Sequence, residues 1–181
     1  NGRGGIYSSG NRNAIGGAAP GAGNVIAYNG GRNIPEANGI KITSGTRNAI
    51  LGNSIFANGG LGIDLGTYLV TANDNCDGDT GANMQQNFPL LTQALSGNGT
   101  GVRGTLNSRA SSTFLLQFFA SPACDSLGNG EGQVYLGQKM IVTSNNCNAS
   151  FVATLPGQVP VGYAITATAT DSANNTSEFS A

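Results

Sequence analysis

The 181-residue chain contains no histidine and no tryptophan. Histidine is the usual general base of hydrolytic triads, and no serine stands in a G-x-S-x-G turn, so the sequence excludes the common serine-hydrolase arrangements. Zinc sites need clustered cysteine or histidine, and the three cysteines of this chain lie far apart. Neither a triad nor a zinc centre is therefore expected.

Charge is also scarce. Eight basic and nine acidic residues give a net charge of −1 and a pI near 5.1. The basic residues are scattered, so they form no stripe for nucleic acid or for an anionic membrane. No apolar run is long enough to span a bilayer, and no signal peptide is present. Because residues 1–6 already belong to a repeat, we interpret the chain as a fragment or a processed product, in which a missing export signal says little about location.

Glycine is abundant, with 29 residues, and asparagine is frequent. Hydrophobic residues make up 39% of the chain, a composition of folded rather than disordered proteins. Low charge with much glycine and asparagine is typical of secreted β-proteins, so we expect an extracellular or cell-surface location. Three cysteines permit one disulfide and one remaining thiol. The spacing leaves the pairing open; we expect Cys124–Cys147, since both lie in the second half of the chain.

A repeat organises the first third of the chain. Between residues 38 and 66 isolated isoleucines recur among Gly, Asn and Ser at intervals that no helical period fits. Asn38-Gly39-Ile40 returns as Leu61-Gly62-Ile63, 23 residues on, which is about one coil of a parallel β-helix. Three further blocks recur in the same order: residues 12–15 match 47–50, 23–26 match 52–55, and 29–31 match 58–60.

The upstream copy carries two insertions, near residues 17–22 and 32–37, which a solenoid tolerates in its turns. Equivalent asparagines should stack in hydrogen-bonded ladders, a structural role that we prefer to ligand binding. The pairs are Asn13 and Asn48, Asn24 and Asn53, and Asn29 and Asn58. The side chains predicted to point inward are Ile6, Ile15, Val25, Ile26, Ile40, Ile42, Ile50, Ile55, Ile63 and Leu65.

An acidic turn follows the repeat. Asp74, Asp77 and Asp79 lie within six residues, next to Gly78. Clustered carboxylates at a glycine-assisted turn supply the oxygen ligands that calcium prefers, although the spacing is not that of an EF-hand. The alternative is an acidic turn whose side chains cap backbone amides. The sequence thus gives a candidate structural calcium site and no other cofactor.

From about residue 97 the pattern is that of short antiparallel strands separated by Gly, Pro and Asn turns, as in an immunoglobulin-like sandwich. Its expected core contains Phe118, Phe151, Ile165 and Phe179. The expected strands cover residues 102–106, 113–119, 134–137, 139–143, 149–155 and 163–169, with a last one at 176–180. The predicted organisation is coils over 1–70, an acidic connecting segment over 71–96, and a sandwich over 97–181.

Several stretches resemble bacterial right-handed parallel β-helix repeat proteins, which are large, secreted or surface-located and adhesin-like. The resemblance covers nearly the whole chain, in residues 12–66 and in DTGANMQQNFPLL, GTLNS, FFASPACDSLGNGEGQVYLG and ITATATDSANNTSEFSA. It implies an all-β fold in which a pectate-lyase-like, right-handed parallel β-helix of about two to three coils runs into a β-sandwich tail. It implies function less directly, because the same fold carries polysaccharide lyases, glycosidases and phage tailspikes.

Glycoside hydrolysis on such a solenoid needs two carboxylates roughly 5 to 10 Å apart across the sugar. The coils offer only Glu36, in an inserted loop, and Asp64, which alternates with aliphatic residues and should face outward. Lys41 and Arg47 could lie near Asp64, but no motif places them there. The paired Asp, Gly-His-Gly and Arg-x-Lys of polygalacturonases are absent. We therefore predict no catalytic residue and no enzyme activity.

The leading hypothesis is a non-catalytic extracellular structural or adhesive module. Its open N-terminal coil end should self-associate or meet neighbouring coils, and the module could assemble into a surface fibre. One alternative is the C-terminal part of a carbohydrate-active enzyme, a polysaccharide lyase or glycosidase, whose catalytic coils lie upstream. The other is a carbohydrate-binding module that uses the aromatic residues Tyr7, Tyr28 and Phe56.

Overall fold

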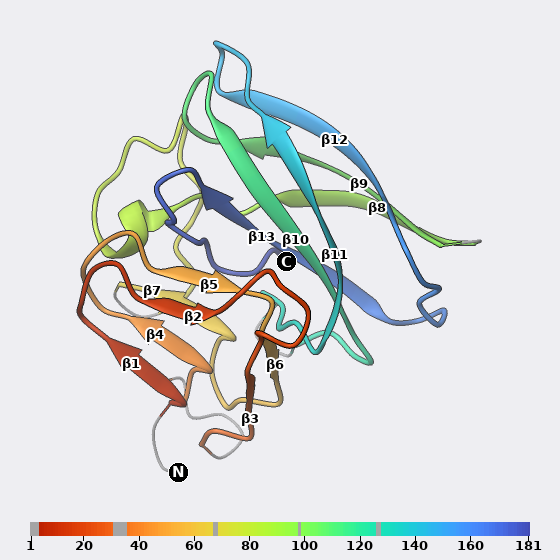
Figure 1. Ribbon diagram of the computed structural model, residues 1–181, viewed down its shortest axis with the longest axis horizontal. Helices are drawn as coiled ribbons and strands as arrows, with labels where there is room; N and C mark the ends of the chain where they lie inside the picture. The colour runs from red at the N-terminus through yellow and green to blue at the C-terminus, as the bar shows by residue number, and fades with distance from the viewer. Residues whose placement is uncertain (1–3, 31–35, 67–68, 98, 126–127) are drawn as a thin grey trace.

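The computed structural model describes residues 4–30, 36–66, 69–97, 99–125 and 128–181. Seven strands of three residues precede six longer ones, and the single described helix, the 3-10 turn η1 (Ala82–Gln85), lies between them (Figure 1). No helix within the described residues is long and apolar enough to cross a membrane. The short strands are β1 (Ile6–Ser8), β2 (Ala14–Gly16), β3 (Val25–Ala27), β4 (Ile40–Ile42), β5 (Ala49–Leu51), β6 (Ser54–Phe56) and β7 (Ile63–Leu65). The longer strands are β8 (Leu90–Ser96), β9 (Thr100–Asn107), β10 (Thr113–Ser121), β11 (Val134–Val142), β12 (Asn148–Leu155) and β13 (Ala164–Asp171).

The short strands form three small parallel sheets, in the orders β1-β4-β7, β2-β5 and β3-β6. Coil 1 (residues 4–30) and coil 2 (residues 36–60) follow the same path, and β7 begins a third. Equivalent residues pair in register, so Ile6 lies beside Ile40 and Ile40 beside Ile63. We call residues 4–66 the coil stack. Parallel strands in the first part and antiparallel strands in the second confirm the prediction of an all-β protein with this order of sheets.

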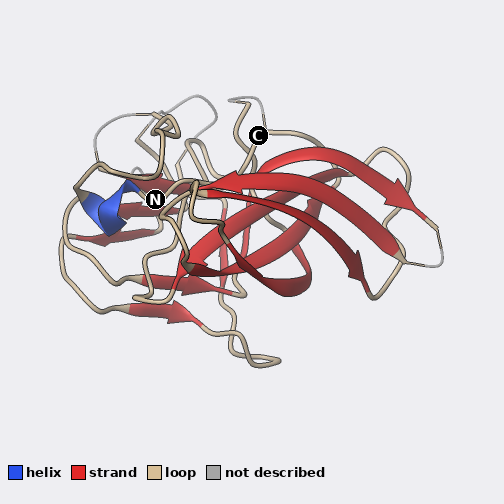
Figure 2. Ribbon diagram, turned by 90° about the horizontal axis from the view of Figure 1, so that it is seen from above, coloured by secondary structure: helices blue, strands red, loops and turns tan. Residues whose placement is uncertain are grey.

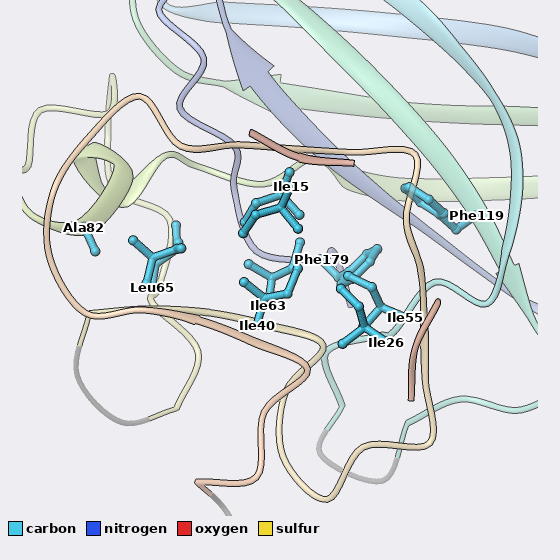
Figure 3. Close-up of a cluster of buried hydrophobic side chains, with 11 residues drawn as sticks. Ile15, Ile26, Ile40, Ile55, Ile63, Leu65, Ala82, Phe119 and Phe179 are labelled. Carbon is cyan, nitrogen blue, oxygen red and sulfur yellow. The ribbon is translucent and has the colours of Figure 1, made fainter. Parts of the chain in front are cut away.

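Isoleucines fill the interior of the coil stack (Figure 3). In a three-residue strand the middle side chain and its two neighbours point to opposite faces. Ile26 therefore lies inside, 6% exposed, while Val25 points to solvent and is 74% exposed. The prediction that Val25 points inward is wrong, because only one of two adjacent strand residues can face the core.

The asparagine ladders are present between the two coils. Each of the coil 2 asparagines accepts, through its Oδ1, both the backbone N–H and the Nδ2–H of its coil 1 partner. The distances from N and from Nδ2 to Oδ1 are 3.1 and 2.9 Å for Asn13 to Asn48, 3.0 and 2.9 Å for Asn24 to Asn53, and 3.2 and 2.9 Å for Asn29 to Asn58. These bonds satisfy turn amides that the sheets do not reach.

The longer strands form two antiparallel sheets, β11-β10-β13 and β12-β9-β8, which extend to one side of the short strands (Figure 2). Strand β8 lies within the stretch expected to be a connecting segment. Strand β11 is a single strand where the sequence predicted two, with a register shift between Phe118 and Phe119 on its partner β10. The core of the two sheets contains the predicted Phe118 and Phe151, whose ring centroids are 5.8 Å apart.

The last residues form a buried tail rather than the expected strand over residues 176–180. An isolated bridge between Thr170 and Thr176, together with hydrogen bonds of Ser177 and Ser180 to Ala169 and Ala167, holds this tail (residues 172–181) to β13. Phe179 is 2% exposed and lies among the isoleucines of the coil stack, next to Phe119, with 5.4 Å between the ring centroids (Figure 3). The prediction that Phe179 belongs to the sandwich core is therefore wrong: the tail crosses from the antiparallel sheets to the coil stack.

Candidate functional site

The backbone of coil 2 and β7 is covered by side chains from much later in the chain. Parallel strands at the end of a stack leave N–H groups without a partner, and a buried unpaired N–H group is costly. Six such groups donate to six side-chain oxygens, whose residues we call the capping residues. The pairs are Arg47 N to Asn175 Oδ1 (2.6 Å), Asn48 N to Asn83 Oδ1 (3.0 Å), Ile50 N to Thr176 Oγ1 (3.0 Å), Gly52 N to Gln117 Oε1 (2.9 Å), Asn58 N to Glu131 Oε1 (3.1 Å) and Leu65 N to Glu178 Oε1 (2.9 Å).

Asn83 extends the first asparagine ladder by one rung. It follows Asn48 by 35 residues, as Asn48 follows Asn13, and it is fully buried. Its φ of 47° puts η1 in a left-handed turn, a conformation that asparagine tolerates better than most residues. Its Nδ2 donates to the carbonyl oxygens of Asn48 at 2.8 Å and Thr176 at 3.0 Å. The turn thus imitates the corner of a third coil.

Glu131 takes the next place in the ladder of Asn29 and Asn58. Its Oε1 accepts the Nδ2–H of Asn58 at 2.8 Å as well as the backbone N–H. Burial raises the pKa of Glu131 above its usual value, although these hydrogen bonds act in the opposite direction. The neighbouring Gly132 exchanges two backbone hydrogen bonds of 2.8 Å with Ile55. A Cβ at residue 132 would come within 2.7 Å of Phe119 and Phe179, so only glycine permits this approach.

Glu178 holds the end of β7. Its Oε1 and Oε2 accept the backbone N–H groups of Leu65 and Thr71, both at 2.9 Å. The side chain is 2% exposed, and burial raises its pKa to about 8. Both oxygens are therefore used in backbone hydrogen bonds, and Glu178 serves as a structural cap.

Asp64 was expected to face outward; it pairs with Lys41 away from the isoleucines, yet it is only 1% exposed. Its Oδ2 accepts from Lys41 Nζ and Asn38 Nδ2, both at 2.6 Å, and Lys41 is its register partner. Burial raises its pKa against these contacts. Glu36 is exposed at the turn before β4, so the two carboxylates do not form an open pair that could flank a sugar.

The three predicted calcium ligands do lie together. Oxygens of Asp74, Asp77 and Asp79 are within 4.8 Å of one another. Asp77 is 4% exposed and accepts from Asn87 N at 3.1 Å and Ser108 Oγ at 2.5 Å. The Oδ1 atoms of Asp74 and Asp79 are buried and accept no hydrogen bond from the described residues. Burial and then the charges of Asp74 and Asp77 raise the pKa of Asp79 to about 6. Such a group could hold a divalent cation, with further oxygen ligands from backbone or water.

The disulfide differs from the prediction. Cys147 pairs with Cys76, at a Cα–Cα distance of 5.2 Å, while Cys124 is free and exposed. Cys76 also donates its N–H to Asn107 Oδ1 at 2.7 Å. The expectation of Cys124–Cys147 used sequence position alone, whereas the pairing depends on the acidic turn folding back over the start of β12. The disulfide therefore anchors the acidic turn to the antiparallel sheets.

A pocket of about 780 Å³ lies beside the third ladder. Tyr28 and Phe56, two of the three aromatic residues considered for carbohydrate binding, line it and meet edge to face, with 5.5 Å between ring centroids. Tyr28 is 73% exposed, and Glu131 lies in the same wall. The third aromatic residue, Tyr7, is 74% exposed on β1 and does not line this pocket.

Sequence reasoning found the acidic turn but missed all six capping residues as a group. Only Asn83 carried a signal, its spacing from Asn13 and Asn48. Comparison of the chain with protein families and with curated proteins finds no match, so its function has to be inferred from this geometry.

Proposed function

We propose that this chain is a non-catalytic extracellular structural module that closes one end of a right-handed parallel β-helix. The observation that carries the proposal is the set of six capping residues, which accept five backbone N–H groups of coil 2 and one of β7. A stack of coils needs such a cap, because an open end exposes strand edges to pairing with other chains. The antiparallel sheets and the tail supply it.

The finer description of the fold rests on the same contacts. Three parallel sheets whose strands stack in register are the arrangement of a β-helix, here of two to three coils. Two three-stranded antiparallel sheets enclosing a phenylalanine-rich core support an immunoglobulin-like sandwich. The resemblance to secreted, adhesin-like β-helix proteins agrees with both.

The buried carboxylates support a structural role rather than catalysis. Glu131 and Glu178 accept backbone N–H groups, and Asp64 is paired with Lys41. A general acid or nucleophile has to reach a substrate, whereas these three groups are at most 7% exposed. The disulfide Cys76–Cys147 supports folding in an oxidising, extracellular compartment.

A structural calcium ion at Asp74, Asp77 and Asp79 is part of the same proposal. Two buried carboxylate oxygens that accept nothing from the described residues, next to a third carboxylate, leave an excess of negative charge that a cation would neutralise. The ion would brace the acidic turn at the point where the chain leaves the coil stack.

A matched pair of variants at Glu131 tests the capping role. Glu131→Ala removes the acceptor of two hydrogen bonds and should lower the free energy of unfolding by about 1 to 3 kcal/mol. Glu131→Gln keeps an oxygen at the same place and should lower the free energy of unfolding much less. Urea unfolding curves give both values. Equal losses in the two variants would contradict a capping role.

A screen of acidic and neutral polysaccharides tests the absence of catalysis. The chain should release neither reducing nor unsaturated sugars. Release that survives in Glu131→Gln, Glu178→Gln and Asp64→Asn would show an active site elsewhere; release that these changes abolish would show that the buried carboxylates are catalytic. Either result would contradict the proposed function.

Carbohydrate binding is a second candidate, favoured by Tyr28 and Phe56 in the wall of the 780 Å³ pocket. Aromatic faces and edges beside polar groups are suited to sugar rings. A glycan array that gives a signal with the native chain and none with Tyr28→Ala would support it.

A further inference from the structure

The three asparagine ladders all run in one direction. In each, the residue of coil 1 donates its backbone N–H and Nδ2–H, and the residue of coil 2 accepts through Oδ1. The coil stack therefore has two chemically different ends. At the ladder positions, the end beyond coil 2 presents N–H donors, and the end before coil 1 presents side-chain acceptors.

The donor end is closed. The N–H groups of Asn48 and Asn58, which would continue two of the ladders, donate to Asn83 and Glu131. The other four capped amides are taken in the same way by Gln117 and by residues of the tail. A further coil cannot reach this end without displacing the cap.

The acceptor end is open. Asn13 and Asn24 are exposed, and none of the described residues donates to the Oδ1 of either. Within the part of the chain that the structure describes, strands β1, β2 and β3 each pair along one edge only. Below them, Ile15 and Ile26 are 8% and 6% exposed, against 3% and 1% for Ile50 and Ile55 one coil further in. Among the described residues, this face therefore has ladder acceptors without donors, above aliphatic side chains that are already largely buried.

We infer that the open face of coil 1 is a docking surface for the donor face of an uncapped coil of the same repeat, carried by the same polypeptide ahead of coil 1. Such a coil supplies what the two asparagines lack among the described residues, backbone N–H groups at the ladder positions. Coil 2 is joined to β7 by a short turn, from Asn58 to Ile63, and a coil linked in this way is held at high local concentration. This inference rests on the proposed function, because it assumes that the cap ends the stack.

A second copy of the chain does not fit the same surface. Head-to-tail stacking needs a free donor end, and the capping residues occupy it. Head-to-head stacking brings the Oδ1 atoms of Asn13 and Asn24 against equivalent acceptors rather than against donors. The sequence left two possible occupants of the N-terminal coil end, a neighbouring coil and a second copy of the chain. The polarity of the ladders favours the neighbouring coil.

An extended chain tests the inference. A duplicate of residues 38–60 is placed directly ahead of Gly4, in place of residues 1–3, so that its last Asn-Gly-Gly joins Gly4-Gly5-Ile6 as Asn58-Gly59-Gly60 joins Leu61-Gly62-Ile63. In the duplicate, the amides equivalent to Asn48 and Asn53 should become hydrogen-bonded to Asn13 and Asn24. They should then exchange with solvent roughly tenfold or more slowly than random-coil amides.

The control is Asn13→Ala with Asn24→Ala, made in both the native and the extended chain. The double change loses the Nδ2 contacts to coil 2 in both backgrounds, but it loses docking acceptors only in the extended one. Amides of the duplicate should lose their protection, and the melting temperature should fall further in the extended chain than in the native chain. An extension that exchanges as random coil, or an equal fall in both backgrounds, would overturn the inference.

Sedimentation velocity on the native chain over a hundredfold range of concentration distinguishes the occupants. A monomer throughout is expected. A dimer or polymer that disappears in the extended chain would show that a second copy occupies coil 1 and would overturn the inference. Failure of the proposed function has a different signature, equal losses in Glu131→Ala and Glu131→Gln, which the extension does not affect.

Discussion

Asn48 and Asn83, 35 residues apart, hold each other through two hydrogen bonds: the backbone N–H of Asn48 donates to Asn83 Oδ1 at 3.0 Å, and Asn83 Nδ2 donates to the carbonyl of Asn48 at 2.8 Å. Both side chains are fully buried. A residue in a 3-10 turn thereby does for coil 2 what an asparagine of coil 2 does for coil 1. At the capped end of the stack, single side chains accept the hydrogen bonds that the next coil would otherwise accept.

Replacing Asn83 should be costly. Asn83→Ala leaves the N–H and the carbonyl of Asn48 buried without partners, and each such loss costs about 1 to 3 kcal/mol. Asn83→Asp keeps an oxygen for the N–H, but its second carboxylate oxygen faces the carbonyl oxygens of Asn48 and Thr176 and its charge is buried, so a loss at least as large is expected. Chemical denaturation of both variants gives the comparison. An Asn83→Ala variant with an unchanged free energy of unfolding would contradict a stabilising role of the Asn48–Asn83 contact.

Stability should fall as the pH rises. Burial raises the pKa of Glu178 from 4.5 to about 8, so between these values the folded chain binds more protons than the unfolded one. The free energy of unfolding therefore decreases across this range. Asp64, Glu131 and Asp79, with pKa values also raised mainly by burial, act in the same direction.

Glu178→Gln should flatten this dependence, because the amide keeps an oxygen for the Leu65 N–H and does not titrate. Melting temperatures at pH 5, 6, 7 and 8 measure the slope for the two proteins. A native chain that is more stable at pH 8 than at pH 5 would contradict the burial of these carboxyl groups.

Breaking the disulfide should destabilise the chain. Cys76 and Cys147 are 71 residues apart, and closing a loop of this length is worth about 4 kcal/mol in the chain-entropy treatment. The double change Cys76→Ala with Cys147→Ala should lower the free energy of unfolding by up to that amount. Cys124→Ser is the matched control and should have little effect, because Cys124 is exposed and free. A comparable loss in Cys124→Ser would restore the Cys124–Cys147 pairing expected from the sequence, which both variants would break.

Calcium should stabilise the native chain through the acidic turn. Addition of calcium at pH 7.5 should raise the melting temperature, with chelator as the reference. Asp79→Asn removes one ligand and should abolish the increase. The same change should stabilise the chelated protein slightly, because it removes a charge that Asp74 and Asp77 repel. No calcium effect on the native chain would show that the turn is only a network of hydrogen bonds.

The sequence predicted what depends on regular spacing within the chain. Equivalent isoleucines and asparagines recur, so the parallel strands and all three ladders followed from the repeat. Among the side chains predicted to point inward, Val25 was wrong, because its neighbour Ile26 takes the inward position. The acidic turn followed from local composition. These features are encoded within one or two coils of the residues that form them.

The cap could not be predicted in this way. Arg47 and Asn175, whose backbone N and side-chain Oδ1 are 2.6 Å apart, are 128 residues apart in sequence, and no local pattern marks a glutamine, a threonine or a glutamate as a partner for a distant amide. The position of Phe179 in the core of the coil stack has the same origin, because the tail crosses to it from the antiparallel sheets. The choice of Cys76 over Cys124 depends instead on how the acidic turn meets the start of β12.

Hydrogen exchange of the native chain, followed residue by residue, tests the capped end most directly. The amides of Arg47, Asn48, Ile50, Gly52, Asn58 and Leu65 each donate to a capping side chain and should exchange only through global or near-global unfolding. Their protection should match that of the core amides in β10. Exchange of these six amides at rates close to those of an unfolded chain, while β10 remains protected, would contradict the cap and with it the proposed role of the chain.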